Sequence, residues 1–253
     1  MFYNNATCDI YIGTGAGKKL MREIENSKRS VKIVSPFLSP FLVKKLIELH
    51  KRNIKIQLIT TDTIEDFYGN RDKNIHQLIL QDRTIDKDME TLCLKWKNRK
   101  RLFQYLFTGI FVILFVMGYW LQNFRVLFGF LPLFIIWYMI RNYSSKIRNV
   151  IIYSYSYRQL FPFKVFESSN NQWYPHTFVH GKMYLIDDEI AYLGSLNFTG
   201  NGTKSNYETR IRITDQRALK ELANEFDVLF QNEDMPERDI TSWGKELYVE
   251  PRN

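Results

Sequence analysis

A long run without charged residues is the feature that most constrains how this chain can fold. No Asp, Glu, Lys or Arg occurs between Leu102 and Leu121. About 20 residues in a helix rise roughly 30 Å, which is the thickness of the hydrocarbon core of a bilayer. The run therefore predicts a helix that spans a membrane, and a helix buried in a protein core is the alternative.

A second apolar stretch follows after a short break and runs from Val126 to Ile140, with Pro132 inside it. It is short for a span, and it crosses a bilayer only if Phe124 and a snorkelling Arg125 extend it. The two stretches together predict a transmembrane helical hairpin with spans at about 102–121 and 124–140. A buried core hairpin or a re-entrant loop remains the alternative.

Basic residues flank this hairpin and set its expected orientation. Five precede it and three follow it, against Arg125 alone at the tip: Lys95, Lys97, Arg99, Lys100, Arg101, then Arg141, Lys146 and Arg148. Cytoplasmic loops carry an excess of Lys and Arg. We therefore expect a multi-pass membrane protein with two spans and with both flanking soluble parts on the cytoplasmic side.

The same residues explain the basic character of the chain, whose formal net charge is +8. Without the nine Lys and Arg between Lys95 and Arg148, the chain has 26 basic and 27 acidic residues. No broad basic surplus is then left for nucleic acid. Lys204, Arg210 and Arg212 could still form a local basic track.

The residues before the hairpin alternate between strand and helix patterns. Strands are predicted at Cys8–Ile12, Val31–Ser35 and Ile54–Thr60, and helices at Lys18–Asn26 and Pro40–Lys51. This order is typical of a parallel sheet covered by helices. A long polar helix at about Lys73–Lys100 is expected to lead into the membrane.

The residues after the hairpin predict further strands of the same sheet. These are Phe163–Phe166, a hairpin of Thr177–Ile186 and Ile190–Ser195 that turns at Asp187, and Tyr207–Ile213; a last helix follows Asp215. The chain thus reads as one α/β domain whose first part is 1–70 and whose second part is 161–253. Residues 71–160 form the inserted helical and membrane region.

Polar groups that suit phosphate chemistry gather in this second part. They are His180, Lys182, Asp187, Ser195, Asn197 and Glu208. Strand alternation would put His180 and Lys182 on one face, where an imidazole attacks phosphorus while Lys182 and Asn197 stabilise the phosphate oxygens. Glu208 would accept from the other ring nitrogen and fix the tautomer.

The spacing of these residues, HxKx4Dx6GSxN from His180 to Asn197, resembles the motif of the phospholipase D superfamily. The resemblance implies a phospholipase D-like sheet flanked by helices. It also implies that His180 forms a phosphohistidine or protonates the leaving group, and that Lys182 and Asn197 bind phosphate with help from Ser195. Asp187 would be a structural acid at the hairpin turn.

The motif occurs once, whereas this chemistry needs two histidines, and no second HxK lies near Val31–Ser35. The single-motif members of the superfamily form a homodimer with one site on the two-fold axis, so a homodimer is expected here. We expect no cofactor, and no metal, because no cluster of Cys, His and carboxylates has ligand spacing.

Two catalytic functions use this mechanism. The first is a phosphodiesterase that acts on membrane phospholipids by hydrolysis or phosphatidyl transfer. The second is a membrane-tethered, metal-independent endonuclease, and Gly194–Thr199 resembles the small nucleases of the superfamily more than its cardiolipin synthases. A non-catalytic membrane scaffold is the third alternative.

Overall fold

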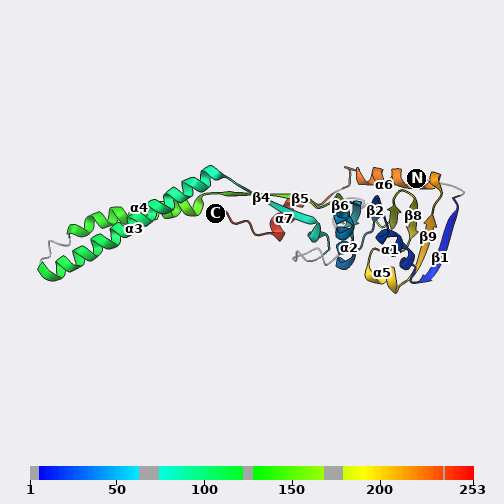
Figure 1. The fold of residues 1–253 in the computed structure, drawn as a ribbon, viewed down its shortest axis with the longest axis horizontal. Helices are drawn as coiled ribbons and strands as arrows, with labels where there is room; N and C mark the ends of the chain where they lie inside the picture. The colour runs from blue at the N-terminus through cyan, green and yellow to red at the C-terminus, as the bar shows by residue number, and fades with distance from the viewer. Residues whose placement is uncertain (1–5, 63–73, 122–127, 168–178, 236) are drawn as a thin grey trace, which may run out of the picture. The chain divides into compact units, whose positions relative to one another are not determined.

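The computed structural model describes residues 6–62, 74–121, 128–167, 179–235 and 237–253 (Figure 1). These residues divide into two compact units. One contains Met1–Gln81 and Tyr157–Tyr248, and the other contains Asp82–Ser156 and Val249–Asn253. We call them the sheet unit and the helical unit.

A mixed sheet of seven strands forms the centre of the sheet unit. The strands lie in the order β1 (Cys8–Thr14), β9 (Tyr207–Ile213), β8 (Ile190–Gly194), β7 (Met183–Ile186), β2 (Ser30–Val34), β3 (Lys55–Thr61) and β6 (Phe163–Phe166). The pairs β2–β3 and β3–β6 are parallel, and the pairs from β1 to β2 are antiparallel. The α/β class predicted from the sequence is confirmed, with a sheet that is mixed rather than parallel.

Helices cover both faces of this sheet. One core joins Val31 and Ile33 of β2 to α1 (Gly17–Glu25) and α2 (Pro40–Lys51), and α7 (Ile240–Leu247) adds Trp243 to it. The other core joins Val34 to α6 (Gln216–Phe230). Residues 31 and 33 point to one face and residue 34 to the other, as strand alternation requires.

The first predicted strand occupies an unexpected place. We expected it to continue the parallel βαβαβ order, but β1 pairs antiparallel with β9, with Cys8 opposite Ile213, and forms an edge of the sheet. The side chains of Ile10 and Ile12 are 65% and 58% exposed. Central strands of parallel sheets are buried on both faces, so a strand with this exposure suits an edge.

The single helix expected over residues 73–100 is wrong. The described residues form a 3₁₀ helix, η2 (Asn74–Leu78), then β4 (Ile79–Ile85), and only then α3 (Lys87–Leu121). The Asp86 carboxylate accepts from the backbone N–H groups of Asp88 and Met89 at 3.0 Å, so it caps α3 and fixes its start. β4 pairs with β5 (Tyr153–Gln159), a strand that the sequence did not predict.

The helical unit contains α3 and α4 (Leu131–Asn149), which lie side by side (Figure 1). The rings of Phe103 and Tyr143 stack with centroids 5.9 Å apart, and those of Phe111 and Phe130 meet edge to face at 6.0 Å. A small core of Cys93, Val150 and Ile152 lies in the same unit. An inserted helical pair is therefore present.

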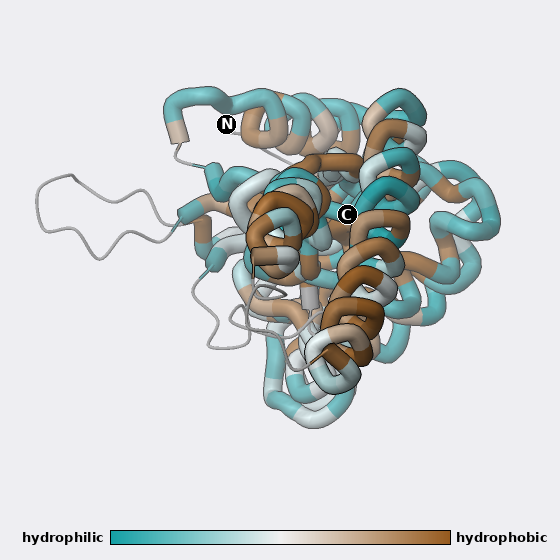
Figure 2. The backbone as a smooth tube through the Cα atoms, turned by 90° about the vertical axis from the view of Figure 1, so that its left-hand side faces the viewer, coloured by the Kyte–Doolittle hydropathy of each residue, from teal (hydrophilic) through white to brown (hydrophobic). Residues whose placement is uncertain are grey.

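Among the described residues, one helix is long and apolar enough to cross a membrane, namely α3. The mean hydropathy of its apolar window is 1.9, and none of that window is buried inside the protein. Figure 2 shows hydrophobic turns, in brown, along the helical pair.

Over its described residues, the second predicted span does not form a helix that is long and apolar enough to cross a membrane. Pro132 lies in the first turn of α4 rather than inside a longer helix, and Leu131–Ile140 rises only about 15 Å, half the hydrocarbon thickness. The rest of α4 carries Arg141, Lys146 and Arg148. Residues 124–127 of the predicted span lie outside the described residues.

Candidate active site

The first two residues of the motif lie just before a strand rather than in one. β7 begins at Met183, opposite Leu193 of β8 and Val34 of β2. Both ladders of β7 end at Met183, whereas the contact between β8 and β9 continues past Leu193: Gly194 pairs with Arg210, and the N–H of Ser195 donates to the carbonyl of Thr209 at 3.1 Å. Residues 179–182 therefore have no ladder to join, and the predicted strand 177–186 is too long. Residues 177 and 178 lie outside the described residues.

The side chain of Lys182 is hydrogen-bonded to the main chain of His180. The Nζ of Lys182 donates to the carbonyl oxygen of His180 at 2.8 Å, and the His180 residue is exposed. Burial lowers the pKa of Lys182 from its usual range, while the nearby Glu208 carboxylate acts in the opposite direction. The ammonium group is thus positioned between the histidine loop and the acid on β9.

Glu208 is a buried carboxylate, 7% exposed, that organises the second half of the motif. It accepts one hydrogen bond from the Ser195 hydroxyl and another from Asn206 Nδ2 at 3.1 Å. The backbone N–H of Thr209 donates to Ser195 Oγ at 3.0 Å. Ser195 is therefore fixed by strand β9 on two sides. That Glu208 orients the His180 ring remains a prediction.

Gly194 makes the close approach of β8 and β9 possible. Its φ is +148°, and a Cβ at this position would lie 2.1 Å from the carbonyl oxygen of Thr209. No side chain fits in that space. The glycine that precedes Ser195 in the motif is thus required by the backbone that positions Ser195.

Asn197 lies in the wall of a pocket of about 590 Å³. Its Oδ1 is buried and has no hydrogen-bond partner within the described part of the chain. The lining residues are all uncharged: Phe37, Leu38, Ser39, Phe41, Asn197, Thr199, Gly200, Asn201 and Asn206. Asn206 also binds Glu208, so the pocket and the Ser195–Glu208 pair belong to one site.

The loop after β2 supports this segment, which sequence reasoning missed. Ser35 Oγ accepts from the N–H of Phe198 at 2.9 Å, and Ser39 Oγ accepts from the N–H of Gly200 at 3.0 Å. The sequence signal was Ser35 directly after a buried strand and Ser39 directly before the next helix. Asn206 was missed as well, although it precedes Glu208 by two residues and alternation would place both on one face.

Asp187 lies at the far end of β7 from the site. Its carboxylate accepts from the backbone N–H groups of Lys28, Arg29 and Ser30, at 2.9, 2.6 and 2.9 Å. Burial raises the pKa of this carboxyl, but these bonds outweigh burial and the pKa is lowered. Asp187 and Asp188 have φ of 55° and 56°, as a tight hairpin turn requires. The contacts of Asp187 thus tie the β7–β8 turn to the start of β2.

Two of the three basic residues near the motif are already engaged. Arg210 is 9% exposed and donates to the carbonyl of Ala16 at 2.8 Å. Arg212 forms an ion pair with Glu23 at 3.1 Å. The local basic track expected at residues 204, 210 and 212 is therefore reduced to Lys204, which is exposed.

Known proteins resemble this chain in sequence pattern and fold. Residues 141–230 match the family described as "Cardiolipin synthase, PLD-like domain". NucT from Helicobacter pylori is 14% identical with a TM-score of 0.50, over 92% of this chain and 100% of that one. No curated protein matches this sequence.

Two further solved structures are similar at lower scores. Nuc from Salmonella typhimurium, a phospholipase D family member, is 12% identical with a TM-score of 0.42, over 92% of this chain and 99% of that one. The phosphatidylserine synthase of Haemophilus influenzae is 13% identical with a TM-score of 0.43, over 95% of this chain and 42% of that one.

The mixed sheet and the convergence of Lys182, Ser195 and Glu208 are compatible with a phospholipase D-like domain. The family match over residues 141–230 and the fold similarity to NucT show that this chain resembles the phospholipase D superfamily.

Proposed function

We propose that this protein is a membrane-anchored phosphodiesterase that acts on phospholipids, by hydrolysis or by phosphatidyl transfer, in a homodimeric site. The observation that carries the choice of substrate is the apolar window of α3, of which none is buried inside the protein. An anchor inserted within the catalytic chain keeps the site near phospholipid headgroups. A nuclease gains little from that constraint.

The proposed reaction proceeds in two displacements. His180 attacks phosphorus, a P–N bond forms, and the P–O bond to the leaving group breaks. The second His180, from another copy of the chain, gives a proton to the leaving oxygen and then takes one from the incoming water or alcohol. Attack by that oxygen breaks the P–N bond and restores the first histidine.

Lys182 and Asn197 are proposed to stabilise the charge on the phosphoryl oxygens. The position of Lys182 beside the histidine loop supports this role, as does the amide of Asn197 in the pocket wall. Ser195 is proposed to assist, and Glu208 to hold Ser195 and Asn206 in place.

A membrane-tethered endonuclease is the second candidate, and the fold shared with NucT is compatible with either reaction. Nucleic-acid binding takes most of its affinity from Lys and Arg that neutralise phosphates. The burial of Arg210 and the Arg212–Glu23 ion pair leave few such groups near the motif, which favours the lipid.

The two substrates are distinguished by one experiment on the full chain in detergent. Purified protein is incubated with anionic phospholipid in mixed micelles and, in parallel, with single-stranded DNA and RNA, with EDTA present and absent. We expect lipid product with or without EDTA, lost in His180→Ala and reduced in Lys182→Ala. The control Lys220→Ala changes an exposed lysine on α6 and should keep full activity.

Cleavage of nucleic acid without lipid product would overturn the substrate and leave the mechanism. Loss of activity in EDTA that zinc or magnesium restores would overturn the mechanism. A fully active monomer, found by light scattering on the active fraction, would overturn the homodimeric site. A properly folded protein without either activity would favour the scaffold.

We also propose that both flanks of the helical pair lie in the cytoplasm, with the residues near Asn123 on the other side. The basic flanks support this orientation. In a Cys8→Ala, Cys93→Ala background, Asn123→Cys should react with an impermeant thiol reagent added outside intact cells. Labelling of a terminal cysteine instead would reverse the orientation, and labelling of neither would favour a re-entrant pair.

A further inference from the structure

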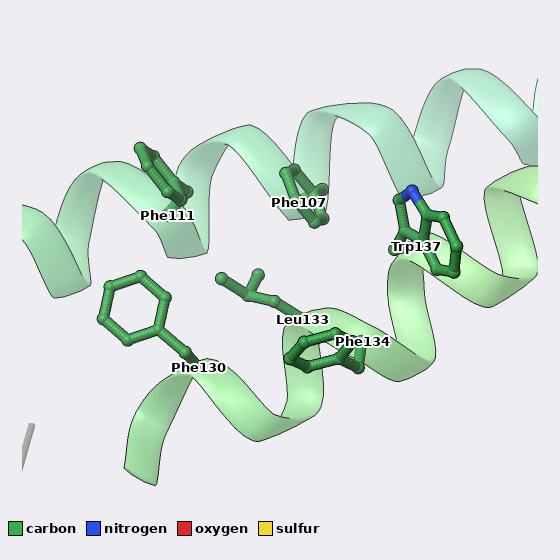
Figure 3. A pocket seen from close by; sticks show the side chains of 6 residues that line it. All are labelled: Phe107, Phe111, Phe130, Leu133, Phe134 and Trp137. Atoms are coloured by element: carbon green, nitrogen blue, oxygen red, sulfur yellow. The ribbon is translucent and has the colours of Figure 1, made fainter. Parts of the chain in front are cut away.

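An apolar groove opens between the two helices of the helical unit (Figure 3). Its volume is about 280 Å³, close to the lower end of small-molecule sites. Phe107 and Phe111 come from α3, Leu133, Phe134 and Trp137 come from α4, and Phe130 is the residue directly before α4. The groove is thus lined by five aromatic rings and one leucine.

Close helix contacts limit the groove at both ends. At the end near the basic flanks, the stacked rings of Phe103 and Tyr143 join the helices. At the other end, a Cβ on Gly129 would lie 2.6 Å from Leu114 Cδ2, so the helices approach closely there. Between these contacts the helices leave an elongated opening, and Phe134 beside it is 70% exposed.

The length of the groove suits one leaflet of a bilayer. Phe130, at the N-terminal cap of α4, and Trp137 are seven residues apart, which corresponds to about 10 Å along the helix. Half of the hydrocarbon core measures roughly 15 Å. An acyl chain that enters beside Trp137 therefore stays within the leaflet that faces the basic flanks.

A cation lies where the headgroup of such a lipid would be. Arg141 follows Trp137 by one helical turn, its guanidinium carbon lies 5.5 Å from the centre of the Trp137 ring, and the residue is exposed. Guanidinium groups bind phosphate oxygens in bidentate geometry. The charge at the mouth thus complements an anionic headgroup, and the apolar lining complements its acyl chain.

We propose that the α3–α4 groove binds one acyl chain of an anionic phospholipid whose phosphate contacts Arg141. This inference rests on the proposed membrane location of the helical pair. The site is separate from the His180 site, so the bound lipid is a resident lipid and its retention does not require turnover.

The test is native mass spectrometry of full-length protein released from nanodiscs that contain equal amounts of dioleoylphosphatidylglycerol and dioleoylphosphatidylcholine. We expect one retained phosphatidylglycerol per chain. Leu133→Trp fills the groove and should reduce this occupancy at least fivefold. The matched control Ile135→Trp adds the same ring on a side chain that is 66% exposed and outside the lining, and should not reduce it.

A second pair of variants tests the headgroup contact. Arg141→Gln should remove the preference for phosphatidylglycerol, whereas Arg99→Gln, which alters an exposed basic residue away from the groove, should keep it. Quenching of tryptophan fluorescence tests lipid binding in the groove without a groove-filling variant. Phosphatidylglycerol brominated in the acyl chain should quench the Trp137 signal, defined by the difference from Trp137→Phe, more strongly than brominated phosphatidylcholine.

Alkaline extraction of membranes separates this inference from the proposed function. Protein that extracts with the soluble fraction would overturn the membrane location and the groove with it. Protein that stays in the membrane, but whose lipid occupancy is the same in Leu133→Trp and wild type, would overturn the groove alone. A Leu133→Trp protein that changes oligomeric state and keeps its lipid would assign the groove to a second copy of the chain.

Discussion

The sheet unit and the helical unit place the same kind of residue in opposite surroundings. In the sheet unit, Phe198 and Phe226 are fully buried. In the helical unit, Phe115 and Trp120 are 66% and 81% exposed. Burial of apolar area is the main favourable contribution to folding in water, so the sheet unit has the organisation of a water-soluble domain.

The helical unit buries few of its large apolar side chains. Its described core consists of Cys93, Val150 and Ile152 with a few partly buried neighbours, whereas most large side chains of α3 after Arg101 face outward. Hydrocarbon solvates such side chains as well as a protein core does. The difference teaches that the sheet unit closes its apolar side chains into a core, whereas the helical unit leaves most of its own exposed, as the proposed membrane location requires.

The largest expected effect separates the units by chemistry. His180→Ala should lower phosphodiesterase activity by roughly 10⁴-fold or more, because it removes the proposed nucleophile. Trp120→Ala, in the helical unit, should keep activity within about twofold in micelles. Initial rates on micellar lipid measure both. Substantial residual activity in His180→Ala, with unchanged circular dichroism, would assign the nucleophile elsewhere.

The second effect separates the units by packing. Phe226→Ala should destabilise the sheet unit by about 3–5 kcal/mol, because it opens a cavity in a closed core. Phe115→Ala should change stability in detergent by less than about 1 kcal/mol, because that ring leaves no cavity. Chemical denaturation in detergent gives both values. Equal losses would mean that the helical unit also has a closed core.

The third effect concerns glycines. Gly194→Ala should cost about 2–3 kcal/mol and lower activity, because the new Cβ meets the Thr209 carbonyl and the φ is positive. Gly109→Ala on α3 meets no described atom within 4 Å, and it should stabilise the helix slightly. Thermal melting compares them. A Gly194→Ala protein with normal stability would contradict the described approach of β8 and β9.

The smallest effect depends on pH. Asp187→Asn should cost about 1–2 kcal/mol at pH 7, because a charged acceptor of three N–H bonds is lost. The folded pKa of Asp187 is lowered. Its contribution is therefore complete above the unfolded value of about 3.9 and is lost as the pH falls through the folded value.

Stability measured from pH 7 to pH 3 should show the difference between wild type and Asp187→Asn shrinking below pH 4. Asp188→Asn is the matched control, because Asp188 has the same left-handed backbone conformation and is exposed. A difference that does not change with pH would show that the charge of Asp187 does not stabilise the turn.

The sequence predicted most strands and helices of the sheet unit because their apolar residues follow clear periods. Val31–Ser35 and Pro40–Lys51, for example, coincide with β2 and α2 within one residue. Pairing was harder to predict. The antiparallel partner of β1 is about 200 residues away in sequence, and no local pattern encodes such a contact.

In the candidate site, too, local patterns were predicted and long-range contacts were not. The motif spacing indicated the polar residues, but the length of the strand before the turn was overestimated, because the β7–β8 ladder ends at the pair Met183–Leu193. Ser35 and Ser39 contribute through tertiary hydrogen bonds to residues more than 160 positions away, which no local spacing predicts. The helix of the second apolar stretch begins at Leu131, later than predicted, because Pro132 lies in its first turn.

The most direct test of the account is detection of the covalent intermediate. Full-length protein is incubated with anionic phospholipid in micelles, quenched at alkaline pH, digested and analysed by mass spectrometry for an acid-labile phosphatidyl group. We predict this group on His180, absent in His180→Ala and present in Trp120→Ala. Turnover of lipid with no adduct on His180, or with the adduct on another residue, would contradict the proposed mechanism.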